Sequence, residues 1–260
     1  MHTIAQLSDR QRVMLDLAGE HGFISVEDMA QHFNVTTQTV RRDINQLCDD
    51  GYLKRFHGGA GLPTSAENIS YDSRAKMAAD NKKRIAFRVA DAIPDGASVF
   101  IDVGTTTEEI ARMLSHKQRL RVVTNSLNVA QILAPKTDFE LIISCGVVRE
   151  SDRAVLGEVS VSFFRQFRLD YGILGTSGID DDGTLLDFDL RKVEITKTII
   201  DRSRSIFLAA DSTKFNRNAM VRSGHLSEVN TLFTNEPLPP KIAQVAREHK
   251  VNVVVCSEAQ

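Results

Sequence analysis

Cysteine is scarce in this sequence and is not arranged for cross-linking. The three residues, Cys48, Cys145 and Cys256, are odd in number, lie far apart and include no Cys-X-X-Cys pair. This pattern predicts neither a disulfide framework nor a zinc site. The seven histidines also lack the spacing of metal ligands. We therefore expect a protein of the reducing cytoplasm that binds no metal and no cofactor.

Long apolar runs are absent as well. No stretch approaches the roughly 20 consecutive apolar residues that a membrane-spanning helix needs. The N-terminal MHTIAQLSDR lacks the basic start and apolar run of a secretory signal, so we expect no membrane partner. With 42% hydrophobic and 25% charged residues, the 260-residue chain has an ordinary globular composition. Its length allows one domain of about 60 residues and a second of ordinary size.

An excess of positive charge is missing too. The chain holds 32 Lys and Arg against 34 Asp and Glu, a net charge of -2, so its bulk charge gives no sign of nucleic-acid binding. The distribution is more informative, because four of the six basic residues within 1–62 are Arg41, Arg42, Lys54 and Arg55. All four belong to the segment that most clearly indicates a function.

Residues 36–47, TTQTVRRDINQL, have the pattern of a helix with one apolar stripe. At about 100° per residue, Val40, Ile44 and Leu47 fall on one side together with Cys48, and Arg42 lies at the centre of the opposite side. The polar side chains away from the stripe are of the types that contact bases and phosphates. The residues expected to bind DNA from this helix are Thr37, Gln38, Thr39, Arg41, Arg42 and Asn45.

The segment before this helix carries the start signals of two shorter helices. Ser8 to Gln11 has the spacing of a capping box, and Ser25 with Asp28 three residues later marks a second start. Two helices, a tight turn and a third helix with polar outer residues make a helix-turn-helix. The apolar residues expected to face inward are Val13, Met14 and Leu17 in the first helix and Met29, Ala30 and Phe33 in the second.

A wing is expected directly after the helix-turn-helix. Leu53 to His57 has the pattern of a strand, and Gly58-Gly59 permits a tight reversal. We expect Lys54, Arg55 and His57 to contact DNA from this wing. A small helical bundle with merely solvated arginines is the alternative. A winged helix-turn-helix domain binds DNA weakly as a monomer and gains affinity when two linked copies bind two half-sites. This predicts a dimer or tetramer on double-stranded operator DNA.

The rest of the chain has a different sequence pattern. Residues 63–81 are polar without sustained periodicity and predict a linker between a first domain at 1–62 and a second at 82–260. Beyond it, uniformly apolar runs alternate with helical patterns, which predicts an α/β domain with a mostly parallel sheet covered on both faces. The apolar runs are 97–103, 120–125, 139–144, 170–175, 205–211, 230–235 and 251–256.

The residues that follow these runs indicate a ligand, because ligands of such sheets bind beyond the carboxyl ends of the strands. Asp102 to Thr107 leads straight into a helix and offers backbone N–H groups, hydroxyls and a helix dipole to a phosphate. Thr and Asn also cap helices for structural reasons, but here they recur at successive strand ends. The expected ligand-binding residues are Asp102, Gly104, Thr105, Thr106, Thr107, Thr124, Asn125, Gly146, Gly175, Thr176, Gly178, Asp211 and Lys214. Lys214 would supply a charge to the phosphate, while Asp102, Asn125 and Asp211 would accept from hydroxyls of a sugar or polyol.

Together these motifs resemble those of the DeoR family of bacterial transcription regulators over nearly the whole chain. The signatures that carry the resemblance are TTQTVRRDI at 36–44, RFHGGA at 55–60, DVGTT at 102–106, TN at 124–125, GTSG at 175–178 and DSTKF at 211–215. The resemblance implies a winged helix-turn-helix and a sensor domain of the sugar-phosphate isomerase and CoA-transferase type. It also implies a repressor that a phosphorylated sugar or polyol releases from DNA.

Three further segments narrow the expected effector. FRLDYGILGTSGIDDDG, LLDFDLRKV and KFNRNAMV are most similar to the branch of the family that regulates glycerol metabolism, which implies glycerol 3-phosphate as the inducer. The chain departs from the family at Cys145-Gly146, where a Gly-Gly pair is common. We expect Cys145 to be a small apolar filler.

Three alternatives stay open at this point. An isomerase-like enzyme is one, with Asp102, Glu194, Lys197, Asp211 and Lys214 as its acid, base and phosphate anchor. A metabolic isomerase has no use for a winged DNA reader, however, and Glu194 with Lys197 is equally an ion pair on a helix face. We therefore expect no catalytic residues. A DeoR-type regulator that responds to another sugar phosphate is the second alternative. An activator is the third, because repression or activation depends on where the operator lies.

Overall fold

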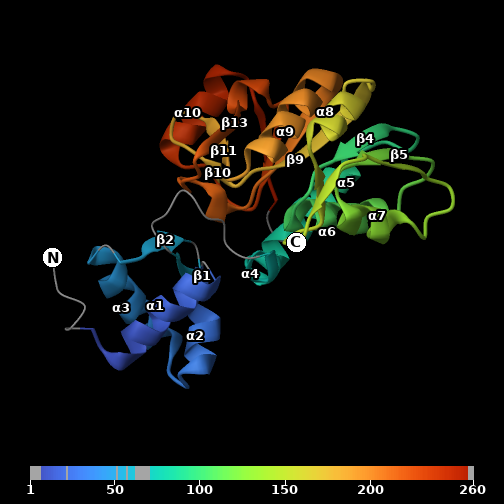
Figure 1. Cartoon of the computed structure of the whole chain (residues 1–260). Coiled ribbons are helices and arrows are strands. Elements are labelled where there is room, and N and C mark those ends of the chain that lie inside the picture. The colour runs from blue at the N-terminus through green and yellow to red at the C-terminus, as the bar shows by residue number, and fades with distance from the viewer. Residues whose placement is uncertain (1–6, 22, 51, 57, 62–70, 257–260) are drawn as a thin grey trace. The chain divides into compact units, whose positions relative to one another are not determined.

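The computed structural model describes residues 7–21, 23–50, 52–56, 58–61 and 71–256 (Figure 1). The chain divides into two compact units, residues 1–78 and 79–260, and each is described by itself. Two helices occupy part of the segment 63–81 that was predicted to be a linker: α4 spans Tyr71–Lys76 and α5 begins at Ala79. No sequence pattern marks α4, because a helix of six residues is too short to show a repeating apolar stripe.

The N-terminal unit is a winged helix-turn-helix, as predicted. Its elements are α1 (Asp9–His21), β1 (Phe23–Ser25), α2 (Val26–His32), α3 (Thr37–Asp49), β2 (Lys54–Phe56) and β3 (Gly59–Gly61). The strands form an antiparallel sheet in the order β1-β3-β2, so the wing is anchored to a strand between the first two helices. The sequence did not reveal β1, because three residues are too few for an alternating pattern.

Side-chain caps fix the starts of these helices. Ser8 and Gln11 form a reciprocal capping box, with Ser8 N–H donating to Gln11 Oε1 at 3.0 Å and Gln11 N–H donating to Ser8 Oγ at 3.2 Å. Ser25 Oγ accepts the N–H of Asp28 at 2.9 Å at the start of α2. Both predicted helix starts are therefore confirmed. The inward orientation expected for Val13 is wrong, because Val13 is 37% exposed, whereas Met14 is fully buried and Leu17 packs partly buried against the same core.

The C-terminal unit is built on a seven-stranded sheet in which every pair of neighbours is parallel, which confirms the predicted α/β class. The strand order is β15-β14-β12-β9-β4-β5-β6. The strands are β4 (Ser98–Ile101), β5 (Arg121–Thr124), β6 (Glu140–Ile143), β9 (Leu169–Gly175), β12 (Ser203–Ala209), β14 (Thr231–Thr234) and β15 (Asn252–Val255).

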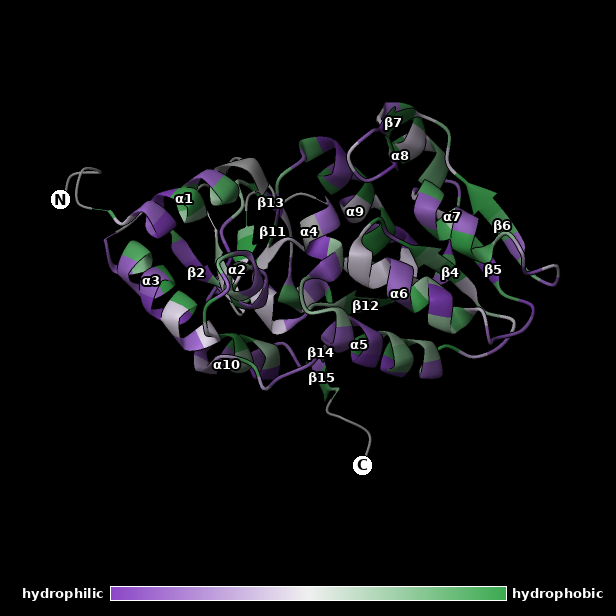
Figure 2. Ribbon diagram, turned by 90° about the horizontal axis from the view of Figure 1, so that it is seen from below, coloured by the Kyte–Doolittle hydropathy of each residue, from purple (hydrophilic) through white to green (hydrophobic). Residues whose placement is uncertain are grey.

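Helices cover both faces of this sheet. Phe100 and Leu174 point into a core shared with α8 (Glu158–Phe164), α9 (Leu190–Arg202) and α10 (Pro240–Glu248). Ile101 and Ile173 point into the opposite core, shared with α5 (Ala79–Asp91), α6 (Thr105–Leu114) and α7 (Leu127–Leu133). Hydrophilic and hydrophobic residues alternate along α5 (Figure 2), as expected for a helix with one buried face.

Two smaller sheets complete the C-terminal unit. β10 (Gly178–Ile179), β11 (Thr184–Asp187) and β13 (Val221–His225) form an antiparallel sheet in that order, and β7 (Val147–Arg149) pairs with β8 (Ala154–Leu156). Short 3-10 helices lie at Ser212–Lys214 and Leu226–Glu228. Cys145, expected to be an apolar filler, is exposed in the loop between β6 and β7, so that prediction is wrong. Among the described residues, no helix has both the length and the apolar character that crossing a membrane requires.

Candidate DNA-binding surface and effector site

The outer face of α3 carries most of the predicted DNA-binding residues. Val40, Ile44 and Leu47 are buried, and Thr36 caps the helix by accepting the N–H of Thr39 at 3.3 Å. This stripe fixes the rotation of the helix and leaves its polar side chains toward solvent. The predicted residues of α3 that are exposed are Thr37, Gln38, Arg41, Arg42 and Asn45, and Thr39 is half-buried.

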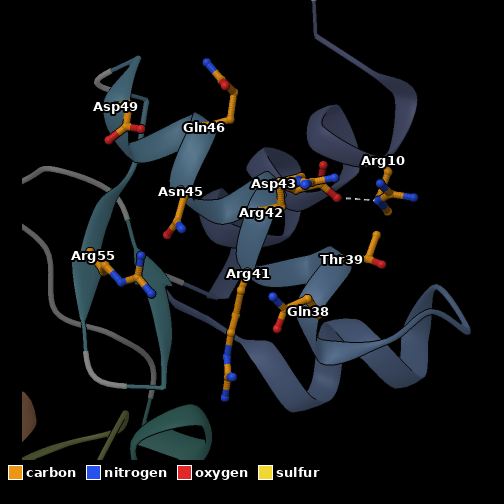
Figure 3. Close-up of a pocket in the computed structure, with 10 residues that line it drawn as sticks. All are labelled: Arg10, Gln38, Thr39, Arg41, Arg42, Asp43, Asn45, Gln46, Asp49 and Arg55. Atoms are coloured by element: carbon orange, nitrogen blue, oxygen red, sulfur yellow. Dashed lines mark hydrogen bonds and ion pairs between the residues drawn. The ribbon is translucent and has the colours of Figure 1, made fainter.

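These side chains surround a surface hollow of about 600 Å³, which we call the α3 hollow (Figure 3). Arg55 extends from β2 toward the same space, so the helix and the wing contribute to one surface. The α3 hollow is lined by Arg10, Gln38, Thr39, Arg41, Arg42, Asp43, Asn45, Gln46, Asp49 and Arg55. Of the remaining predicted residues, Thr37 and Lys54 do not line it, and His57 lies outside the described residues.

Arg41 and Arg55 also line a second hollow of about 430 Å³, between the start of α2, α3 and the wing. Arg41 therefore lies at the junction of the two hollows. Within the part of the chain that the structure describes, Arg41 and Arg42 form no ion pair. Two guanidinium groups without a protein counter-ion on a concave surface suit the phosphates and guanine edges of DNA.

Arg10 and Asp43 were missed by the sequence reading, although both line the α3 hollow. Arg10 Nε donates to Asp43 Oδ2 at 2.5 Å, and this bond, chiefly, raises the pKa of Arg10. The pair neutralises the charge of an acid that lines the same hollow as Arg42. No local pattern identifies such a pair, because its members belong to different helices.

In the C-terminal unit, the predicted ligand-binding residues gather at one edge of the sheet. β12, β9, β4, β5 and β6 are adjacent and parallel, so the segments after them share the carboxyl edge. All thirteen predicted residues lie at these strand ends or in the segments directly after them, where Thr105 to Thr107 form the first turn of α6, Gly178 begins β10 and Lys214 ends a 3-10 helix. The chain adds strands on one side of β4 up to β6 and then on the other side from β9 onward. A parallel sheet binds its ligands at such a switch point.

Three of the predicted hydroxyls hold the loops together. Thr124 Oγ1 donates to the carbonyl of Ile101 at 2.7 Å and accepts the N–H of Ser126 at 3.0 Å. Thr107 Oγ1 donates to the carbonyl of Gly104 at 2.8 Å, within the first turn of α6. Thr176 Oγ1 lies 2.8 Å from the carbonyl of Gly178. The structure therefore gives these three threonines a role in shaping the edge.

Two of the predicted glycines have close backbone neighbours. A Cβ at Gly146 would lie 2.5 Å from the carbonyl oxygen of Leu156, and a Cβ at Gly178 would lie 1.9 Å from that of Arg217. Real Cβ atoms do not approach oxygen so closely, so both positions need glycine for packing. The close approach at Gly146 is thus to the β8 strand.

Other polar side chains at this edge are buried without a hydrogen-bond partner. They belong to the ends of four strands, β5, β6, β12 and β14, and comprise Asn125 Oδ1 and Nδ2, Ser144 Oγ, Asp211 Oδ2 and Thr234 Oγ1. A buried polar group without a partner costs about 1 to 3 kcal/mol, so proteins contain few of them. Their concentration at one edge is typical of a surface that binds a polar ligand.

Basic side chains lie near this edge as well. The pKa of Asp211 is below its ordinary value: burial acts to raise it, but the charges of Lys214 and Lys82 lower it by more. Lys82 is only 3% exposed although it is a lysine of α5. In the sequence, Lys82 is simply the first residue after the predicted linker. Its position in the first turns of α5 gave no sign that it lies near Asp211, more than a hundred residues later.

Lys192 is a second buried lysine that sequence reasoning missed. Its Nζ lies 3.1 Å from Asp102 Oδ2 and 2.9 Å from Asp187 Oδ2. Burial acts to lower the pKa of Lys192, but the two carboxylates raise it above its ordinary value. Burial raises the pKa of Asp102 despite the opposing charge of Lys192, whereas that charge outweighs burial at Asp187 and lowers its pKa. The sequence contained a signal for its burial, because Lys192 lies at helical spacing with Ile195 and Ile199 on the buried face of α9.

The residues of the enzyme alternative are divided, because Asp102, Asp211 and Lys214 lie at the carboxyl edge whereas Glu194 and Lys197 lie within α9. Glu194 and Lys197 lie on the solvent side of α9, where their side chains are 51% and 53% exposed and pair at 3.5 Å. Asp102 is committed to Lys192. No group of three or more His, Cys, Asp or Glu residues that could hold a metal ion occurs within the described ranges.

Comparisons with known proteins cover both units. The family described as the DeoR-like helix-turn-helix domain matches residues 10–66, and the DeoR C terminal sensor domain matches residues 77–236. The glycerol-3-phosphate regulon repressor of Escherichia coli (strain K12) is 43% identical over 249 residues, which cover 96% of this chain and 99% of that protein. The HTH-type transcriptional repressor CsqR of the same organism is 37% identical over 96% of this chain and 95% of its own length. Among solved structures, ribose 5-phosphate isomerase A from Methanocaldococcus jannaschii has a TM-score of 0.40 at 12% identity, covering 53% of this chain and 55% of that one.

Proposed function

Because the chain belongs to the DeoR family of DNA-binding transcription regulators, we propose that it represses genes for the use of glycerol and is released from its operator by glycerol 3-phosphate. Membership of this family indicates that the protein is a regulator and not an enzyme. The observation that carries the choice of regulon is the 43% identity, over nearly the full length of both chains, with a protein named for the glycerol-3-phosphate regulon. Because such a regulator acts on DNA, the proposed location of the protein is the cytoplasm.

The DNA-reading surface that we propose is the outer face of α3 together with the wing. Gln38, Arg42 and Asn45 reach base edges in the major groove, with Arg41 beside them. Thr37, Thr39, Lys54, Arg55 and His57 contact the backbone. The lining of the α3 hollow by residues of α3 and by Arg55 of the wing supports the proposal that helix and wing act as one surface.

The effector site that we propose is the carboxyl edge of the sheet around the start of α6. The first N–H groups of a helix have no partner within it, so the turn Gly104–Thr107 suits the effector phosphate, with Lys214 as its counter-charge. The side-chain amide of Asn125 can accept from or donate to the effector hydroxyls, and Asp211 Oδ2 can accept from them, since these buried atoms have no hydrogen-bond partner among the described residues. A ligand of this kind repays the cost of burying those atoms.

Linkage between the two sites gives the regulation. The protein acts as a dimer or tetramer whose paired readers match two half-sites. Effector binds more tightly to an arrangement of the sensors in which the readers no longer match, and so lowers operator affinity. A differential of a few kcal/mol between the two arrangements is enough to shift the bound population decisively.

A thermal-shift screen tests this proposal most directly. The purified full-length protein is heated with glycerol 3-phosphate, ribose 5-phosphate, fructose 6-phosphate, inorganic phosphate and glycerol. A specific ligand raises the melting temperature by mass action, and we expect the largest increase with glycerol 3-phosphate. A larger increase with another sugar phosphate would identify that compound, and not glycerol 3-phosphate, as the effector. No increase with any phosphorylated compound would contradict a phosphate-binding effector site at this edge.

A further inference from the structure

Three charged side chains from separate elements are buried together beside α6. Asp102 follows β4, Asp187 ends β11, and Lys192 lies in the first turn of α9. Their side chains are 0%, 6% and 8% exposed in that order, and Lys192 Nζ contacts both carboxylates. We call them the Lys192 cluster.

The Lys192 cluster is not electrically balanced. It holds two carboxylates for one ammonium group, a net charge of -1 in a region shielded from water. A pair that served only to stabilise the fold would need one acid, because each further buried charge costs free energy unless it is compensated. Asp102 Oδ1 accepts the N–H of Val103 at 2.8 Å, but Oδ2 is held by the ion pair with Lys192 alone. Asp102 thus depends on Lys192 for its charge compensation.

The position of Asp102 connects this imbalance with the effector. Asp102 stands two residues before Gly104, which opens the first turn of α6. A phosphate bound at that turn brings further negative charge near Asp102, and charges interact strongly where water is excluded. With both carboxylates uncompensated, the cluster would repel the anion that the helix start attracts.

We propose that Lys192 sets the charge of this edge, and that by neutralising Asp102 it allows the start of α6 to accept an anionic effector. Lys192 acts through Asp102 and is therefore a positioning residue that determines selectivity for charge. The inference rests on the proposed function, since it takes the effector phosphate to bind at Gly104–Thr107. Asp187 holds the ammonium group of Lys192 in place. It also limits the neutralisation of Asp102, because the single positive charge is shared between the two carboxylates.

Four variants of the full-length protein test this role, with glycerol 3-phosphate as the probe and titration calorimetry as the measurement. Lys192→Met keeps a long side chain and removes the charge, so we expect affinity to fall at least tenfold. Asp187→Asn removes a competing carboxylate, so affinity should be higher than that of wild type. The double variant restores the net charge of -1 and should return to within threefold of wild type. Lys197→Met, on the exposed face of the same helix, is the control and should leave affinity unchanged.

The outcomes separate this role from a structural one. A lysine that only held α9 in place would make Asp187→Asn weaken binding and would leave the double variant as poor as Lys192→Met; either result overturns the inference. Equal affinity of Lys192→Met and wild type overturns it as well. If Lys192→Met does not fold, Asp187→Asn alone tests the inference, because only charge compensation predicts a gain in affinity for glycerol 3-phosphate in that variant. Failure of wild type to bind glycerol 3-phosphate would instead count against the proposed effector, and the same series would then be titrated with inorganic phosphate.

Discussion

Arg10 and Asp43, which lie on different helices, form an ion pair of 2.5 Å at the rim of the α3 hollow. Their side chains are 33% and 13% exposed, so the pair is partly screened by solvent. Such a pair contributes no more than about 1 kcal/mol to stability. Its position, beside residues that we propose to read DNA, matters more than its strength.

We expect Asp43→Asn to raise affinity for all DNA sequences. The change removes a negative charge from the α3 hollow and releases Arg10 to bind a phosphate. One additional phosphate contact steepens the dependence of log affinity on log salt concentration by about 0.9. Fluorescence anisotropy over a salt series measures this slope. Asp9→Asn is the matched control, because Asp9 pairs with Arg12 outside the hollow; an unchanged slope in Asp43→Asn would show that Arg10 does not reach DNA.

Arg42→Ala should abolish operator recognition without unfolding the N-terminal unit. Arg42 is exposed opposite the buried stripe of α3, so its loss leaves the core intact. A bidentate contact between arginine and a base is worth about 1 to 3 kcal/mol. The affinities for operator and for a scrambled duplex should therefore converge, while the melting temperature stays the same. Arg12→Ala, on the exposed side of α1, serves as the control, and retained operator affinity in Arg42→Ala would contradict our assignment of this face.

Substitutions in the wing should affect DNA binding differently from Arg42→Ala. We expect Lys54→Ala and Arg55→Ala to weaken binding to operator and scrambled DNA by similar factors, because phosphate contacts carry no sequence information. Each should also flatten the salt dependence by about 0.9 in the log–log slope. A loss confined to the operator would mean that the wing reads bases.

Asn125 and Thr124 are neighbours for which we expect opposite effects. Both polar atoms of Asn125 are buried without a protein partner, so Asn125→Ala should leave the free protein as stable as wild type while weakening glycerol 3-phosphate binding. Thr124→Val removes a hydroxyl that makes two hydrogen bonds, and should cost about 1 to 3 kcal/mol of stability. Denaturant unfolding and calorimetric titration measure the two quantities. Strong destabilisation by Asn125→Ala would show that Asn125 serves the fold.

Thr105→Val and Lys214→Ala should produce constitutive repression. Each removes one hydrogen-bonding group from the proposed phosphate site, at a cost of about 1.5 to 3 kcal/mol in effector binding, and neither belongs to the DNA-binding unit. Operator affinity should stay near that of wild type, while release requires at least tenfold more glycerol 3-phosphate. Thr198→Val, on the exposed face of α9, is the control. Release of both variants at the wild-type concentration would mean that the Gly104–Thr107 turn is only a helix start.

The sequence by itself determined the features that depend on neighbouring residues. The caps at Ser8 and Ser25, the apolar stripe of α3 and the apolar strands of the parallel sheet were all predicted correctly. Each follows from hydrogen bonds or side-chain periodicity within one segment, which the order of residues fixes directly. Parallel strands also share a carboxyl edge by geometry, so the gathering of the strand ends could be foreseen, whereas their contacts with an effector remain predictions.

Only the tertiary structure decided which charges meet. The pairing of Arg10 with Asp43, the approach of Lys82 to Asp211 and the Lys192 cluster join elements far apart in the chain. Nor did the sequence disclose β1, whose three residues gain their strand conformation from pairing with β3. The physical reason is the same in each case. An ion pair or a short strand exists only where packing of the whole unit places its partner, and burial then makes the partner obligatory.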